Sequence, residues 1–139
     1  MSRFLILYPV LVQVLLTMTV YVLLNFAKLR AVRRGEVDLA RRALHDDAWP
    51  DSVVKINNNI RNQFEVPVLF YILCFIFALL DAVTTEALVL AWLFAGSRIV
   101  HAYVHVGANY VPARRRAFML GCVVVVAMTL LAAWEMLRR

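Results

Sequence analysis

Cysteine is scarce in this sequence, which contains only Cys74 and Cys122. Both residues fall inside apolar runs, where a thiol behaves as a small hydrophobic group. Their number and spacing exclude a disulfide framework, a zinc motif and a redox pair. Internal repeats, low-complexity tracts and linkers are lacking too, and 139 residues are enough for one domain. We therefore expect a single domain over residues 1–139, without disulfides.

Charged residues are also few, at 17% of the chain, whereas 63% of the residues are hydrophobic. Soluble domains have roughly 45–50% apolar residues. With a mean hydropathy of +0.75, the chain has more apolar surface than its own interior can bury, so lipid must be the solvent for much of it. The net charge of +6 and the pI near 9.9 do not indicate nucleic-acid binding, because the basic residues lie between apolar runs, as in cytoplasmic loops.

Four apolar runs are long enough to cross a bilayer, which takes about 20 residues per helix. The predicted spans are residues 4–27, 56–80, 87–108 and 117–136. The second span is apolar only from residue 64 and begins with a polar helical stretch. The first is too long for a signal-peptide core, so we interpret it as retained. The predicted fold is an all-α integral membrane four-helix bundle. A soluble bundle is disfavoured because the fourth run is apolar on every face.

The distribution of basic residues predicts the orientation in the membrane. Residues 28–54 contain five arginines, and we expect a solvated loop there with a helical extension of the first span. The loop after the third span contains the run Arg114 to Arg116, whereas the turn at residues 81–86 has no basic residue. By the positive-inside rule the first and third loops are cytoplasmic and both termini lie outside. Arg3, Arg138 and Arg139 at the two termini favour the opposite orientation, but the difference between the loops is larger.

Polar side chains of the second and third spans are expected at one level of the bundle. Glu65 and His101 each lie about 18 residues from the midpoint of the outer turn, so at 1.5 Å per residue their depths agree. By the same count Arg61 is level with His105, and Arg98 lies somewhat deeper. Arg61 and Glu65 are four residues apart, as are the histidines, which predicts one helical face for each set. Charged groups within spans commonly face the bundle interior or a water-filled cavity.

Three other interpretations of this set are a structural salt bridge, a metal site, and a proton relay or transporter. Glu65 and an arginine, Arg98 or Arg61, would form a buried salt bridge that only sets the helix register. A metal site built from His101, His105 and Glu65 is disfavoured, because the nearby arginines repel a dication. A proton relay or transporter is possible for any intramembrane glutamate and histidine, but four spans without an internal repeat disfavour it.

We favour an anion site. Arg61, Arg98 and the run Arg114 to Arg116 supply planar, permanently charged donors for carboxylates. Asn62 and Glu65 add groups that can hold an amide or an ammonium. A ligand with carboxylates, amides and one amine fits this set better than a simple phosphate does, and the adjoining lipid-facing surface would admit an apolar co-substrate.

Three motifs resemble a known family, the membrane-associated proteins in eicosanoid and glutathione metabolism (MAPEG). Residues 61–65 read Arg-Asn-Gln-Phe-Glu, similar to the family's Arg-Asn-x-x-Glu followed by proline on the second helix. Residues 98–101 read Arg-Ile-Val-His, similar to the Arg-x-x-His of the third helix, and residues 112–114 read Pro-Ala-Arg, as at the start of the fourth. The motifs occur in the family's order, and the resemblance covers all four spans.

The resemblance implies a homotrimer that binds glutathione, or a related low-molecular-weight thiol, between adjacent subunits near the cytoplasmic side. It also implies a divergent bacterial-type branch located in the inner membrane. In the family, arginines at the end of a neighbour's first helix join the site, and here these are Arg30 or Arg33. The implied ligand-binding residues are Arg30, Arg33, Arg61, Asn62, Glu65, Arg98, His101 and His105, and the implied catalytic residues are Arg114 and Arg115.

Several positions depart from the family pattern. His105 stands where prostaglandin E synthase-like members have a tyrosine, Arg115 replaces their serine, and Phe118 replaces their fourth-helix tyrosine. Phe118 cannot donate a hydrogen bond. Proline also follows Glu65 after one residue, closer than in the eicosanoid-producing members.

Two hypotheses about function therefore stay open. The first is a glutathione-dependent transferase or peroxidase that acts on lipophilic electrophiles, with Arg114 or Arg115 stabilising the thiolate. The second is a non-catalytic lipid-binding or scaffold protein of the same family. Loss of the serine and the tyrosine favours the second, whereas retention of Arg61, Asn62 and Glu65 favours the first.

Overall fold

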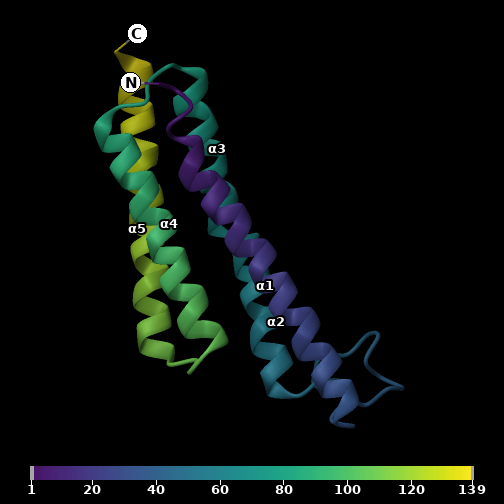
Figure 1. Cartoon of the computed structure of the whole chain (residues 1–139). Coiled ribbons are helices and arrows are strands. Elements are labelled where there is room, and N and C mark those ends of the chain that lie inside the picture. Colours follow the sequence, from purple (N-terminus) through teal and green to yellow (C-terminus); the bar gives the residue numbers. More distant parts are fainter. Residues whose placement is uncertain (1, 139) are drawn as a thin grey trace.

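The computed structural model describes residues 2–138 and is built from helices (Figure 1). They are α1 (Leu7–Arg33), α2 (Asp51–Gln63), α3 (Val66–Leu79), α4 (Thr85–Val106) and α5 (Val111–Leu137), with a short 3-10 turn at Asp46–Ala48. Helix α1, the α2–α3 unit (Asp51–Leu79), α4 and α5 are each long and apolar enough to cross a membrane. The predicted all-α membrane bundle with four spans is confirmed.

The ends of the helices differ from the predicted spans in ways that local chemistry explains. Helix α1 continues past residue 27 to Arg33, which is the helical extension expected from the sequence. Helix α5 begins at Val111 rather than 117, since Pro112 lies in its first turn, where a missing N–H group leaves no hydrogen bond unmade. Helix α4 begins after Thr84, whose hydroxyl accepts a hydrogen bond from the Ala87 N–H at 3.2 Å.

The second span is interrupted at Phe64 and Glu65, between α2 and α3. Pro67 lies in the first turn of α3 and has no N–H group to continue the hydrogen bonding of α2. Glu65 therefore precedes α3 rather than following Arg61 by one turn of a continuous helix. The prediction that Arg61 and Glu65 share one helical face is wrong for this reason.

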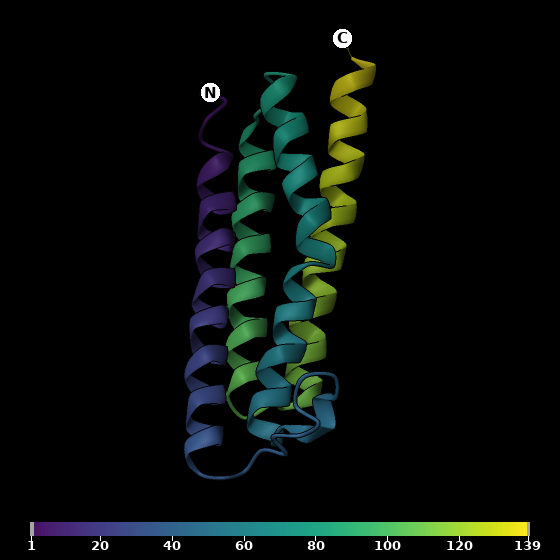
Figure 2. The same cartoon turned by 90° about the vertical axis from the view of Figure 1, so that its right-hand side faces the viewer.

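Two clusters of buried apolar residues hold the spans together. One joins α1, α3, α4 and α5 and includes Phe70 and Phe94, whose stacked rings have centroids 4.3 Å apart. The other joins α1, α2 and α4 and includes Leu24, Ile60 and Ala102. The two views place both termini at the end of the bundle that holds the first cluster (Figures 1 and 2).

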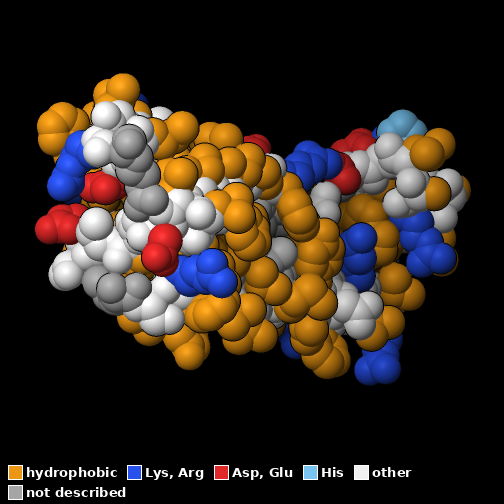
Figure 3. All heavy atoms as spheres, turned by 90° about the horizontal axis from the view of Figure 1, so that it is seen from above, with side chains coloured by type: hydrophobic (Ala, Val, Ile, Leu, Met, Phe, Trp, Pro, Cys, Tyr) orange, Lys and Arg blue, Asp and Glu red, His pale blue; other side chains and the backbone are white. Residues whose placement is uncertain are grey.

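The spans separate toward the opposite end. There the α1–α2 pair diverges from the α4–α5 hairpin (Figure 1). Hydrophobic side chains cover the middle of the visible face in the space-filling view, and most charged side chains gather toward its two ends (Figure 3). Many large apolar side chains are exposed along α1, α3, α4 and α5, as in a protein whose spans lie in lipid.

The loop between α1 and α2 contacts the bundle through charged side chains. Arg61 of α2 forms a salt bridge with Asp46, and Arg41 forms one with Asp47 at 2.8 Å. The second bond holds the pKa of the Asp47 carboxyl below its usual value. The Lys28 ammonium lies 5.0 Å from the centre of the Trp49 ring. The loop is exposed, as the sequence predicts, but its charges attach it to α1 and α2.

Candidate functional site

The guanidinium of Arg98 lies buried beside the site, in contact with Asn62 and Phe118, two residues of the pocket lining. Its side chain projects from α4 toward α2, and the residue is 1% exposed. Its Nη2 donates a hydrogen bond to the Asn62 carbonyl at 3.0 Å. Its Nε and Nη1 have no hydrogen-bond partner among residues 2–138. The guanidinium carbon lies 5.7 Å from the centre of the Phe118 ring. Two buried cationic donors are thus left for a group outside the described chain.

His101 and His105 lie one and two turns beyond Arg98 on the same side of α4, and both are buried. His101 Nδ1 lies 3.1 Å from the Arg114 carbonyl oxygen, so this nitrogen is the donor of the ring. His101 Nε2 is buried without a partner among the described residues. The Asn62 amide lies 3.5 Å from His105 Nδ1. The α4 face predicted from the spacing of these residues is therefore turned toward α2 and α5.

The three consecutive arginines of α5 point in different directions. Arg114 is partly buried, and its Nη1 donates to the Asn109 side chain at 2.6 Å. Asn109 has a positive φ of 51°, a conformation that asparagine tolerates better than most residues. Arg115 and Arg116 are exposed. Because successive helical residues point about 100° apart, Arg115 lies on the side of His101, whereas Arg116 lies on the opposite side of the α4–α5 hairpin.

Two pockets meet at Arg114. The first, of about 290 Å³, lies between α2, α4 and α5. Its lining is Asn62, His101, Val111, Arg114, Arg115 and Phe118. The second, of about 350 Å³, lies nearer the loops and is more polar. Its lining includes Asp51, Lys55, Asn58, His105, Asn109 and Arg114. Together the two pockets bring three cationic side chains, a carboxylate and several amides beside the histidines.

Some of the residues predicted from the sequence lie apart from this group. Arg61 is exposed, and its guanidinium forms a salt bridge with Asp46. Glu65 is exposed, does not line the pocket beside His101, and forms no salt bridge among residues 2–138. The interpretation of Glu65 as half of a buried salt bridge is therefore wrong for the single subunit. Arg30 and Arg33 lie exposed in the last turn of α1.

A buried chain of amides was not predicted from the sequence. Gln13 of α1 donates to Gln63 at 2.7 Å, Gln63 donates to Asn59 at 3.0 Å, and Asn59 lies 3.4 Å from the Ala102 carbonyl. Asn59 and Gln63 share the face of α2 that carries Ile56 and Ile60, at helical spacings of three and four. That periodicity is the signal that would have identified them as buried. The network joins α1, α2 and α4 beside the site.

Lys55 is a second residue that sequence reasoning missed. Its Nζ donates to the Gly107 carbonyl at 2.9 Å, so it links the start of α2 to the α4–α5 turn. Among the described residues, no group of three or more His, Cys, Asp or Glu side chains is arranged to hold a metal ion. The polar side chains that line the two pockets are mainly those of arginine, lysine, histidine and asparagine, with Asp51 as a carboxylate.

The fold and the site define an integral, multi-pass membrane protein with a basic, partly buried site at one end of a helical bundle. A family model described as the MAPEG family matches residues 6–134, and the chain belongs to this family. Comparisons with curated proteins and with solved structures each gave no match. The resemblance seen in the three motifs is thus confirmed. Membership connects the chain in general to glutathione- and eicosanoid-related roles in membranes.

Proposed function

We propose that this protein is a membrane-bound glutathione-dependent transferase or peroxidase that acts on lipophilic electrophiles. The observation that carries the proposal is Arg98, whose buried guanidinium has two donors without partners in the chain. A buried charge without compensating bonds is costly. A peptide carboxylate would satisfy these donors with charge-assisted hydrogen bonds. Glutathione, or a related thiol, has such carboxylates as well as amides and one amine.

The chemistry requires a thiolate beside the pocket. A free thiol has a pKa of about 8.5 and is mostly protonated at neutral pH. A cation within about 4–6 Å lowers such a pKa by one to three units. Arg114 lines both pockets and Arg115 lines the first, which supports the proposal that one of them stabilises the thiolate. The sulfur then attacks the electrophilic carbon, and the leaving group departs with the bonding electrons.

The site is proposed to be completed by a neighbouring subunit. Glu65 lies near the middle of the second span and is exposed in the single chain. An ionised carboxylate facing hydrocarbon is costly and calls for a partner. In a homotrimer, a neighbour and the ligand would cover Glu65, and Arg30 or Arg33 of the neighbour would reach the site. By the positive-inside rule this end of the bundle is cytoplasmic, and both termini lie outside, in a bacterial inner membrane.

Equilibrium binding of glutathione to the detergent-purified protein tests this function. We expect saturable binding, and an ultraviolet difference spectrum of the thiolate near neutral pH. Glu65→Gln should weaken binding while leaving thermal unfolding nearly unchanged, because Glu65 makes no salt bridge within the described chain.

Arg114 and Arg116 form a matched pair for the chemical step. Arg114→Ala should raise the apparent pKa of the bound thiol and lower turnover of a chloronitrobenzene, whereas Arg116→Ala should change neither, since its side chain lies on the other side of the hairpin. If both substitutions had equal, small effects, the only role supported for these arginines would be to orient the protein in the membrane.

A non-catalytic lipid-binding role is the second candidate. Phe118 favours it, because the pocket beside His101 has no side-chain hydroxyl in its lining. A protein that retains lipid but shows no thiolate spectrum at any glutathione concentration would support this role over the transferase.

A further inference from the structure

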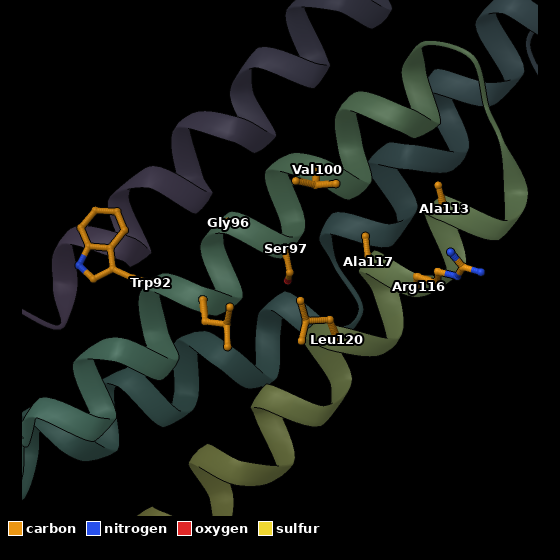
Figure 4. Close-up of a pocket in the computed structure, with 9 residues that line it drawn as sticks. Trp92, Gly96, Ser97, Val100, Ala113, Arg116, Ala117 and Leu120 are labelled. Atoms are coloured by element: carbon orange, nitrogen blue, oxygen red, sulfur yellow. The ribbon is translucent and has the colours of Figure 1, made fainter.

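A large groove runs along the outside of the α4–α5 hairpin. Its volume is about 620 Å³, and its lining shares no residue with the two polar pockets. Figure 4 shows that its walls come from both helices, with Trp92 and Arg116 at opposite ends of the labelled residues. The groove therefore lies on a different face from the proposed thiol site.

The groove is open because its walls are small. A Cβ atom added at Gly96 would meet no atom within 4 Å. Ala113 and Ala117 contribute small side chains to the wall from α5. The Ser97 hydroxyl donates to the Phe94 carbonyl of its own helix at 2.7 Å, so it offers no hydrogen to a ligand. The floor of the groove is thus suited to hydrocarbon.

Arg116 is the one charged residue in the lining. It is exposed and forms no salt bridge among residues 2–138. It lies in the second turn of α5, close to the end of the span, where a lipid headgroup is found. A guanidinium donates to phosphate oxygens in a planar, paired arrangement. The charge at this end of the groove is complementary to an anionic headgroup.

The length of the groove fits one leaflet. Trp92 and Val100 lie eight residues apart on α4, or about 12 Å at 1.5 Å per residue. One leaflet of the hydrocarbon core is about 15 Å thick, half of the full 30 Å. A chain that starts at Arg116 and follows the groove toward Trp92 therefore stays within a single leaflet.

We propose that this groove binds an anionic phospholipid, with one acyl chain between α4 and α5 and the phosphate on Arg116. The alternative occupant is a neighbouring subunit, whose exposed Glu65 would offer Arg116 a carboxylate, and the measurements below separate the two occupants. The proposal is independent of the thiol chemistry, since none of its residues lines the polar pockets.

Fluorescence quenching by brominated lipids tests the proposal. The chain has three tryptophans, and a variant with Trp49→Phe and Trp134→Phe keeps only Trp92 as the reporter. It is reconstituted in vesicles of phosphatidylcholine and phosphatidylglycerol, with bromine on one lipid or the other. We expect quenching to show a preference of about fivefold for phosphatidylglycerol, the effect of about one surface arginine.

Two pairs of substitutions distinguish a specific lipid site from a general attraction of anionic lipids to the basic end of the protein. Arg116→Ala should abolish the preference, whereas Arg115→Ala, which changes charge by the same amount on the other side of the helix, should keep most of it. Gly96→Leu should lower quenching by the brominated phosphatidylglycerol, because a Cβ atom at this position meets no other atom within 4 Å and the rest of the side chain would occupy the groove. Val89→Leu, at an exposed α4 position outside the groove, should have no effect.

Equal quenching by the two lipids in the Trp92 protein would overturn the proposal. Equal losses from Arg115→Ala and Arg116→Ala would overturn it too, because they would show only a diffuse surface charge. If Gly96→Leu changes the mass of the detergent-solubilised particle but not the lipid preference, the groove is a contact between subunits instead.

Discussion

The hydrogen bonding of Arg98 distinguishes a ligand-binding role of this residue from a purely structural one. It is buried in α4 and uses one donor on the Asn62 carbonyl, and no carboxylate forms a salt bridge with it among residues 2–138. A residue retained for stability alone would be expected to satisfy its charge within the fold. The free donors of Arg98 point instead to an anionic ligand.

Replacing Arg98 by methionine should abolish glutathione binding and stabilise the unliganded protein. The substitution removes a buried, unpaired charge at similar volume and so relieves its desolvation cost, and the lost bond to Asn62 offsets about 1 kcal/mol of this gain. Thermal unfolding in detergent and equilibrium binding would be measured on the same sample. Destabilisation by roughly 3–5 kcal/mol, together with a wild type that binds no thiol, would favour a structural salt bridge completed outside the subunit.

At the scale of elements, the loop between α1 and α2 and the break before α3 decide what Arg61 contacts. The break separates Arg61 from Glu65, and the loop brings Asp46 to the Arg61 guanidinium. If Arg61 holds a ligand carboxylate, as the family motif implies, then Asp46 competes with the ligand for it. Contact between the loop and Arg61 would therefore weaken ligand binding at the site.

Asp46→Asn should tighten glutathione binding. An exposed salt bridge is worth about 0–1 kcal/mol, so the expected gain is at most about fivefold, and it should shrink as the salt concentration rises. Isothermal titration at low and high salt measures it. Asp47→Asn is the matched control, because Asp47 pairs with Arg41 rather than with Arg61. Weaker binding by Asp46→Asn would mean that Asp46 orients Arg61 for the ligand instead of competing with it.

At the scale of the whole molecule, the single chain leaves charged groups exposed on its outer surface. Glu65 and Arg61 are both exposed, and Arg30 and Arg33 lie at the end of α1, where the α1–α2 pair diverges from the hairpin. Contact with other copies would cover Glu65 and would place the basic end of α1 near a second subunit's pockets.

We expect a trimer in mild detergent, with Glu65 and Arg61 covered at the contact between subunits. Light scattering coupled to size-exclusion chromatography measures the mass of the particle without its detergent. A monomer at every protein concentration would contradict both the trimer and the shared site. A trimer that binds no glutathione would support the proposed assembly and contradict the proposed activity.

The sequence by itself determined the architecture, because lipid leaves few solutions for a chain with four long apolar runs. It also identified the face of α4 that carries Arg98, His101 and His105, since helical spacing does not depend on what packs against the helix. The family followed from the order of three short motifs, which the match over residues 6–134 confirms.

Only the tertiary structure decided which polar groups are buried and which are paired. Pro67 interrupts the helix locally, but only the folded chain shows that Glu65 faces outward although its spacing from Arg61 predicted one face. Likewise, Gln13 and Gln63 are fifty residues apart in the chain and meet only because α1 packs against α2. Periodicity describes one helix at a time, whereas burial and pairing are properties of helices in contact.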